Sequence, residues 1–128
     1  MKTMNLFKTL LIAVITCFAT TNLSARSTEN QLIYNTEEVN GVKVSETVYK
    51  MDGKTLTQFM KYNYKYDANQ QMTENLSQKW DASANTWVNN LKICYTYDNK
   101  GMTTEYYKWN AKKSTFILVP EMTVTMDK

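Results

Sequence analysis

The feature that most constrains this chain is a turn signal that recurs along it. Five stretches place an aromatic residue or Met before Asp or Asn and small polar residues: MDGKT, YDANQQ, WDASAN, YDNKG and WNAKKS, starting at positions 51, 66, 80, 97 and 109. Asp and Asn side chains accept hydrogen bonds from backbone amides two residues further on, which favours turns. Asn40-Gly41 adds the strongest short hairpin signal. Turns therefore divide the chain into short segments of similar length.

The segments between these turns are rich in Tyr, Val, Thr and Ile, which favour extended strands. In residues 60–66, Met and Tyr occupy every even position and Lys or Asn every odd one; in residues 91–97, Leu, Ile and Tyr occupy every odd position. Such alternation is typical of a half-buried strand. Because the segments leave no room for a crossover helix, neighbouring strands are predicted to pair antiparallel.

The sequence therefore predicts an all-β fold: an antiparallel meander of about six to seven strands, linked by short hairpin turns and preceded by a cleavable N-terminal signal helix. The expected strands cover residues 30–38, 42–51, 55–66, 72–80, 87–97, 102–109 and 115–126. Pro120 has no amide hydrogen to donate to a strand ladder, so the last strand should bend there or lie at an edge.

Residues 64–81 and 95–110 have similar sequences, which we interpret as two similar strand ends and turns. The copies differ in one spacing. In the first copy Met and Trp are eight residues apart, at Met72 and Trp80, and in the second they are seven apart, at Met102 and Trp109. If both pairs face inward, one of the two strands must carry a β-bulge.

The N-terminus has the pattern of an export signal. Two lysines precede an apolar run, LLIAVITCFA, at residues 10–19, and a polar stretch follows. The run is shorter than the roughly 20 residues that a membrane-spanning helix needs, so no permanent membrane span is expected. The sequence predicts a protein that is exported to the periplasm, the outer surface or the medium.

The predicted organisation is a signal peptide at residues 1–25 and a single β-meander domain at residues 26–128. Cleavage is expected after Ala25, with a cut after Thr21 as the alternative. A second alternative makes Cys17 a lipid attachment site. Thr16 argues against lipidation, because bacterial lipoprotein signals normally have Gly, Ala or Ser directly before that cysteine.

Composition disfavours several function classes. The chain has no histidine, which removes the usual catalytic triads and the common zinc sites, and it contains no phosphate-binding loop, dinucleotide fingerprint or nucleophile elbow. Without the leader, 13 basic and 12 acidic residues remain, a net charge of +1, so nucleic acid is not an expected partner. We expect a protein that is not an enzyme and needs no metal or cofactor.

A carboxylate-based hydrolase is the remaining enzymatic alternative. Glu74 and Glu105 occupy comparable places early in two related strands, and a pair of carboxylates suffices for glycoside hydrolysis. The same positions suit solvent-facing strand residues. The aspartates stand where turns require them, so a structural role is the favoured interpretation for Asp52, Asp67, Asp81 and Asp98.

Cys94 is the only cysteine that remains after the predicted cleavage, so no disulfide within one mature chain is possible. A small buried thiol is the expected state. The alternative is an intermolecular bridge in a self-associating protein, in which the exposed edges of strands pair with another copy.

The stretches YKYDANQQMT and YTYDNKGMT resemble the tyrosine-aspartate repeats of large secreted Rhs-type shell proteins, although the array is too short to close a shell. In its length, its leader and the order of YTYDNKG, YYKWN and FILVPEMT, the chain is similar to a family of small exported proteins of unknown function from Bacteroides-type bacteria. This resemblance spans most of the mature region. It implies a secreted all-β protein and supplies no catalytic residues.

The aromatic residues carry the functional hypothesis. Tyr and Trp side chains bury a large area and are expected to supply the core, but a meander without a covering helix must curl, pair or leave one face in water. An aromatic face that is exposed to solvent would bind an extracellular glycan or a protein. The candidate binding residues are Trp80, Trp87, Trp109, Tyr106 and Tyr107.

Overall fold

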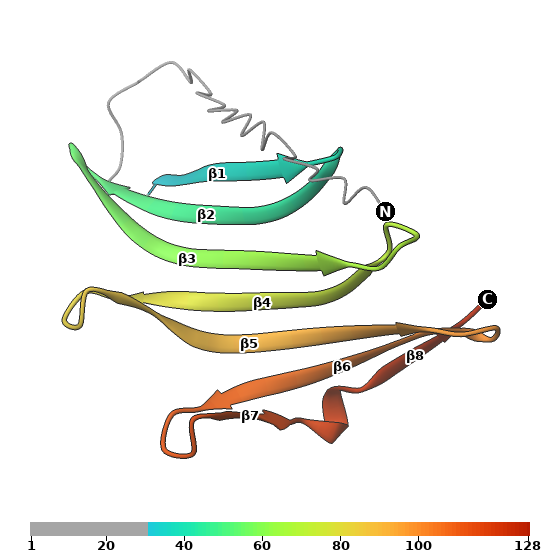
Figure 1. Cartoon of the computed structure of the whole chain (residues 1–128). Helices are drawn as coiled ribbons and strands as arrows, with labels where there is room; N and C mark the ends of the chain where they lie inside the picture. The colour runs from blue at the N-terminus through green and yellow to red at the C-terminus, as the bar shows by residue number, and fades with distance from the viewer. Residues whose placement is uncertain (1–30) are drawn as a thin grey trace, which may run out of the picture.

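The computed structural model describes residues 31–128, which form one antiparallel sheet of eight strands (Figure 1). The strands are β1 (Gln31–Val39), β2 (Val42–Asp52), β3 (Thr55–Tyr66), β4 (Met72–Asp81), β5 (Thr86–Tyr97), β6 (Gly101–Asn110), β7 (Thr115–Leu118) and β8 (Val124–Asp127). From β1 to β7 each strand pairs with the next in chain order. The predicted all-β meander is confirmed, whereas the predicted signal helix, its cleavage sites and Cys17 lie outside the described residues.

The last predicted strand is divided at Pro120, as its missing amide hydrogen led us to expect. A 3-10 turn, Pro120–Met122, separates β7 from β8, and both short strands pair with the same edge of β6. The amide of Val119 donates to the carbonyl of Tyr106 at 2.8 Å, which holds the turn against the sheet. Within residues 31–128, no helix is long and apolar enough to cross a membrane.

The two similar stretches, residues 64–81 and 95–110, form equivalent turns at one end of the sheet, which we call the turn end. Asp67 Oδ1 accepts hydrogen bonds from the amides of Asn69 at 2.9 Å and Gln71 at 3.0 Å. Asp98 Oδ1 accepts from the amides two and three residues further on, at 2.8 and 2.9 Å. These are Asx turns, and they lie where the two similar stretches predict the end of a strand and a turn.

The repetition also extends to the opposite end of the sheet, which we call the hairpin end. WDASANTW (80–87) and WNAKKSTF (109–116) form matching hairpins in which the first and last residues are cross-strand partners. In each stretch the second residue accepts a hydrogen bond from the amide three positions on, and the sixth residue has a positive φ, 53° in one and 48° in the other. The repeated unit is therefore a strand, an Asx turn, a second strand and a hairpin.

A bulge in β4 explains the unequal spacing of Met and Trp in the two copies. The register between β3 and β4 shifts at the start of β4 and leaves Thr73 without a direct partner, while β6 pairs with β5 without a shift. The extra residue compensates for the longer spacing. As a result Met72 and Met102 lie on one face of the sheet, and Trp80 and Trp109 lie on the other.

The described residues form a single layer, and they have no closed aromatic core (Figure 1). Among residues 31–128 the buried hydrophobic residues are Val48 and Val119, and no large side chain is fully buried. The expectation that the aromatic residues supply a core is therefore wrong for these residues. Its physical reason is that a sheet without a second layer leaves both faces open, so most aromatic side chains are only half-buried.

Candidate functional site

Cross-strand partners in an antiparallel sheet share a face, so the register assigns the aromatic residues to two surfaces. The first, which we call the tyrosine face, carries Tyr62, Tyr64, Tyr66, Ile93, Tyr95, Tyr97, Met102 and Tyr106. The second, which we call the tryptophan face, carries Gln78, Trp80, Trp87, Asn89, Lys92, Tyr107, Trp109 and Phe116. The two surfaces are chemically different and are considered separately.

Two aromatic pairs mark the hairpin end of the tryptophan face. The ring centroids of Trp80 and Trp87 are 5.1 Å apart with an interplanar angle of 67°, and those of Trp109 and Phe116 are 4.9 Å apart at 63°. Such edge-to-face pairs contribute about 0.5–1.5 kcal/mol each beyond the area they bury. They stabilise the hairpins, and all four rings are half-buried.

Lys92 connects the second aromatic pair to the centre of the sheet. Its Nζ lies 5.1 Å from the ring centroid of Tyr107 and 4.7 Å from that of Phe116, within the range of cation–π attraction. The hydroxyl of Tyr107 donates to Glu105 Oε2 at 3.0 Å, and this hydrogen bond raises the pKa of Tyr107. The hydroxyl is thus held as a donor at neutral pH.

The structure places four of the five sequence-predicted binding residues on one surface. Trp80, Trp87, Trp109 and Tyr107 lie on the tryptophan face, but Tyr106 lies on the tyrosine face opposite Ile93. Neighbouring residues in a strand point to opposite faces, so Tyr106 and Tyr107 are on opposite sides of the sheet.

Sequence reasoning missed Phe116 and Lys92 as members of the aromatic cluster. The signal for Phe116 was present, because it occupies the same place in WNAKKSTF as Trp87 does in WDASANTW. Lys92 had no comparable signal. Its position between two rings depends on the pairing of β5, β6 and β7, which no local pattern reveals.

A row of amide side chains crosses the same face beside the first tryptophan pair. Asn63 Nδ2 donates to Gln78 Oε1 at 3.3 Å, and Gln78 Nε2 donates to Asn89 Oδ1 at 3.0 Å. Further along the face, the buried side-chain oxygens of Asn35 and Gln58 have no hydrogen-bond partner among residues 31–128. This amide row offers donors and acceptors next to the half-buried tryptophan pair.

The carboxylates weighed for hydrolysis lie on this face but already have partners. Glu74 and Glu105 flank Cys94 on the two neighbouring strands. Glu74 Oε1 lies 3.5 Å from Lys65 Nζ, and Glu105 accepts the Tyr107 hydrogen bond described above. Each carboxylate is thus engaged by a neighbouring side chain of its own face.

Cys94 was expected to be buried; it is half-buried, and it forms no disulfide within the described part of the chain. Burial is the main cause that raises the pKa of its thiol. Because the thiolate is the reactive form, this thiol is a weak nucleophile at neutral pH. In the described part of the chain, no group of three or more His, Cys, Asp or Glu residues is placed to hold a metal ion.

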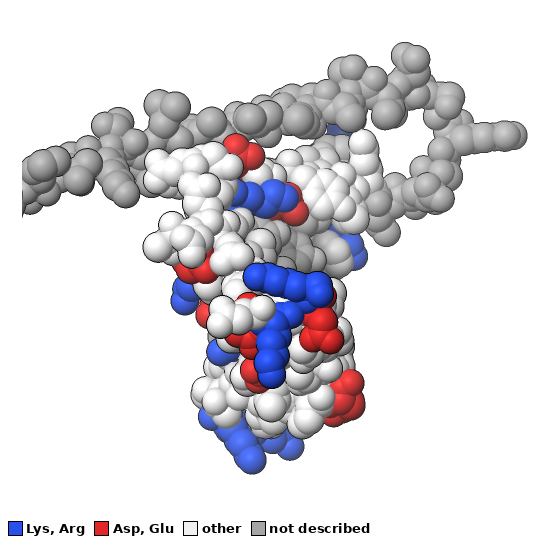
Figure 2. Space-filling model, turned by 90° about the vertical axis from the view of Figure 1, so that its right-hand side faces the viewer, with Lys and Arg blue, Asp and Glu red and all other residues white. Residues whose placement is uncertain are grey.

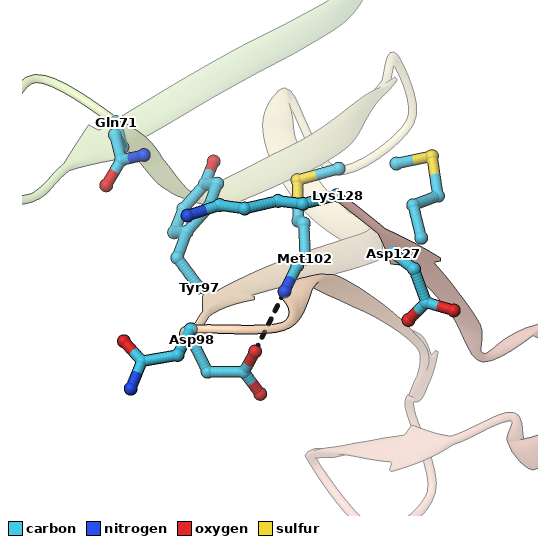
Figure 3. Close-up of a pocket in the computed structure, with 9 residues that line it drawn as sticks. Gln71, Tyr97, Asp98, Met102, Asp127 and Lys128 are labelled. Carbon is cyan, nitrogen blue, oxygen red and sulfur yellow. Dashed lines mark hydrogen bonds between the residues drawn. The ribbon is translucent and has the colours of Figure 1, made fainter.

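A hollow of about 510 Å³ lies at the turn end of the sheet (Figure 3). Its lining includes Tyr97 and Met102 of the tyrosine face, together with Met126 of β8 and the terminal Lys128. The carboxylate of Asp98 also borders it but is turned toward the amide of Gly101, at 2.9 Å, within the Asx turn (Figure 3). The hollow is therefore an extension of the tyrosine face; Asp98 serves the turn, and Asp127 of β8 is its second acidic neighbour.

The fold and the two faces define a single-layer antiparallel sheet protein with an aromatic cluster and an amide row on one side. The chain belongs to the family described as "Family of unknown function (DUF3836)", which matches residues 1–127. A comparison with curated proteins finds no match. The predicted membership of a Bacteroides-type family of unknown function is thus confirmed, while the likeness to Rhs-type repeats stays a prediction.

Three solved structures are similar to this chain. A DUF3836 family protein from Bacteroides vulgatus is 69% identical, with a TM-score of 0.73, over 77% of this chain and 100% of that one. A DUF3836 family protein from Parabacteroides distasonis is 28% identical, with a TM-score of 0.65, over 77% of this chain and 89% of that one. A protein with unknown function from Bacteroides fragilis is 28% identical, with a TM-score of 0.64, over 70% of this chain and 66% of that one.

Proposed function

We propose that this protein is an exported, non-enzymatic binding domain that recognises extracellular glycans through its tryptophan face. The observation that carries the proposal is the position of the amide row. Gln78 and Asn89 are cross-strand partners, as are Trp80 and Trp87, and each amide is two residues from a tryptophan on the same face. Half-exposed rings and amides therefore form one continuous surface.

This combination suits the chemistry of a sugar. The apolar face of a pyranose ring stacks on Trp or Tyr, and its hydroxyls need both donors and acceptors, which amide side chains supply. Binding sites for small ligands generally combine aromatic surface with a few well-placed polar groups. The leader at residues 1–25 supports export, which would bring the face into contact with extracellular polysaccharides.

A glycan array followed by titration calorimetry tests the proposal on the exported protein. We expect Trp87→Ala to weaken binding of an array hit at least tenfold, because it removes a stacking surface beside the amide row. Tyr106→Ala is the matched control, since it removes a half-buried aromatic ring from the opposite face and should leave the affinity unchanged. An array without hits, or equal losses in the two variants, would contradict the proposal.

A protein ligand for the same face is the alternative occupant, and a pull-down with the wild type and Trp109→Ala separates the two. A structural, self-associating role through strand edges is the second candidate function. It is favoured by β1, an edge strand of nine residues that includes the exposed Leu32 and Tyr34. Light scattering with and without reductant tests this role and the contribution of Cys94, and a strict monomer in both conditions would exclude it.

A further inference from the structure

The exposed apolar side chains of the sheet gather on one face. Nine large hydrophobic residues among the described ones are exposed. Six of them lie on the tyrosine face: Leu32, Tyr34, Val88, Ile117, Val124 and Met126. They lie on β1, β5, β7 and β8 and flank the half-buried tyrosines of β3, β5 and β6. Exposed apolar residues concentrated on one face of a sheet mark an interaction site.

Charge is displaced to the margins of the tyrosine face. Its central positions on β3 to β6 carry Tyr, Met, Leu, Ile, Asn, Ser and Thr and no Lys, Asp or Glu. Lys50, Lys79 and Lys108 lie toward the hairpin end of this face together with Asp52 and Asp81, and Lys43 and Glu46 form an ion pair of 2.9 Å on β2. The turn end, which faces the viewer in Figure 2, presents basic and acidic side chains together.

We propose that a second copy of this chain covers the tyrosine face, so that two sheets form a β-sandwich dimer. Sheets that pack face to face lie about 10 Å apart and interdigitate the side chains of their inner faces. A second copy supplies the layer that residues 31–128 lack, and it presents the same face, with an uncharged centre and charges at its margins. The proposal concerns the opposite face from the glycan site and does not depend on that site.

The area of the face matches what a stable dimer requires. Six strands spaced about 4.8 Å apart and about ten residues long cover a surface of about 30 by 33 Å. Each copy would therefore bury about 1,000 Å², and the pair about 2,000 Å², which is the range of permanent homodimers. Such interfaces are also the more hydrophobic ones, as this face is.

Analytical ultracentrifugation of the exported protein tests the dimer. The wild type should sediment with twice the monomer mass at micromolar concentration, and its Tm should rise with protein concentration because association stabilises the fold. Both results should be the same with and without reductant, because Cys94 lies on the opposite face. A wild type that stays monomeric at high micromolar concentration, with a constant Tm, would overturn the proposal.

Charge substitutions matched for exposure separate the two faces. Tyr34→Lys and Val88→Lys, on the tyrosine face, alter residues that are 51% and 36% exposed; Leu56→Lys and Leu118→Lys, on the tryptophan face, alter residues that are 50% and 38% exposed. The first two should raise the dimer dissociation constant at least tenfold, and the other two should leave it unchanged. If the two tryptophan-face variants raised the dimer dissociation constant more than the two tyrosine-face variants did, the proposal would be wrong.

Val88→Lys also distinguishes face packing from edge pairing, because Val88 lies on the interior strand β5. Edge pairing would leave this variant associated, and that result would overturn the sandwich. Circular dichroism confirms that each variant keeps its sheet. Retention of glycan binding by monomeric Val88→Lys would show that the two faces act separately, so failure of either proposal can be recognised without the other.

Discussion

The two faces of this sheet are made by the same strands and carry similar aromatic side chains, but they differ in where they put charge. The tryptophan face distributes Lys61, Lys65, Glu74, Lys92 and Glu105 among its rings, so its centre is solvated. The tyrosine face keeps its charges at the margins. The difference teaches that aromatic content alone does not identify a buried surface, and that the alternate residues of a strand must be judged separately.

The largest expected effect comes from a carboxylate placed on each face at neighbouring positions. Tyr95 is half-buried, and burial raises the pKa of its hydroxyl, which indicates a poorly solvated site. Tyr95→Asp should therefore lower the free energy of unfolding by about 3 kcal/mol. Thr96 is exposed on the opposite side. Thr96→Asp should change stability by only about 0.5 kcal/mol. Urea unfolding measures the change in the free energy of unfolding of each variant. Equal changes in the two variants would contradict the difference between the two faces.

A smaller effect is expected where β8 completes the tyrosine face. A Cβ at Gly101 would collide with the carbonyl oxygen of Met126. Gly101→Ala should therefore displace β8 and cost about 2 kcal/mol.

Gly53→Ala is the control for that substitution, because Gly53 has a φ of 59° but no atom lies within 4 Å of the new Cβ. Its cost should be about 1 kcal/mol, from backbone strain alone. Hydrogen exchange should show lost protection in β8 for Gly101→Ala only, and preserved protection would refute the prediction.

The aromatic pairs of the tryptophan face offer the next test. The Trp80 ring is half-exposed, so its removal should cost less than that of a fully buried Trp. Trp80→Ala should destabilise the protein by about 1.5 kcal/mol. Phe116→Ala, in the equivalent hairpin, should cost a similar amount and should also free Lys92 from one of its rings. Thermal unfolding compares the two, and a negligible loss in both would mean that the pairs contribute little to hairpin stability.

The smallest effect concerns pH and again compares the two hairpins. The carboxylate of Asp81 accepts hydrogen bonds from the Ser83 hydroxyl and from the backbone amides of Ala84 and Ser83. These hydrogen bonds, that of the Ser83 hydroxyl most strongly, lower the pKa of Asp81 from its ordinary value of 3.8. The stabilisation is present above the ordinary pKa and is lost as pH falls through the lowered one. The wild type should therefore lose a little stability as the pH falls, and Asp81→Asn should not show this loss. Asn110→Asp should add a second loss of the same kind. Unfolding measured between pH 2 and 5 checks both, and unchanged profiles would contradict this account.

The strands were largely predictable because their signals are local. Asp67 and Asp98 each fix a turn, because their side chains accept hydrogen bonds from nearby backbone amides. Pro120 ends a strand, because it has no amide hydrogen to donate. The number of layers was not predictable in this way. Aromatic residues that would fill a core in one fold line two open faces here, because covering a sheet depends on distant segments or on other chains.

The candidate site was predictable only in part for the same reason. The tryptophans were recognisable from their type, and Phe116 from the repeated hairpin. The separation of Tyr106 from Tyr107 follows from strand alternation once β6 is placed. The amide row required the registers of β3, β4 and β5, since Asn63, Gln78 and Asn89 are far apart in the sequence and no single segment reveals their contact.

The repeated unit of strand, Asx turn, strand and hairpin has a consequence for how this sheet can change. Strands β1 to β7 pair in chain order, so the duplication or loss of one unit alters the width of the sheet without breaking its remaining ladders. Evolution, or a protein engineer, can therefore widen the sheet in steps of two strands. Because the paired strands are close in sequence, such a widened sheet should also assemble quickly, one hairpin after another.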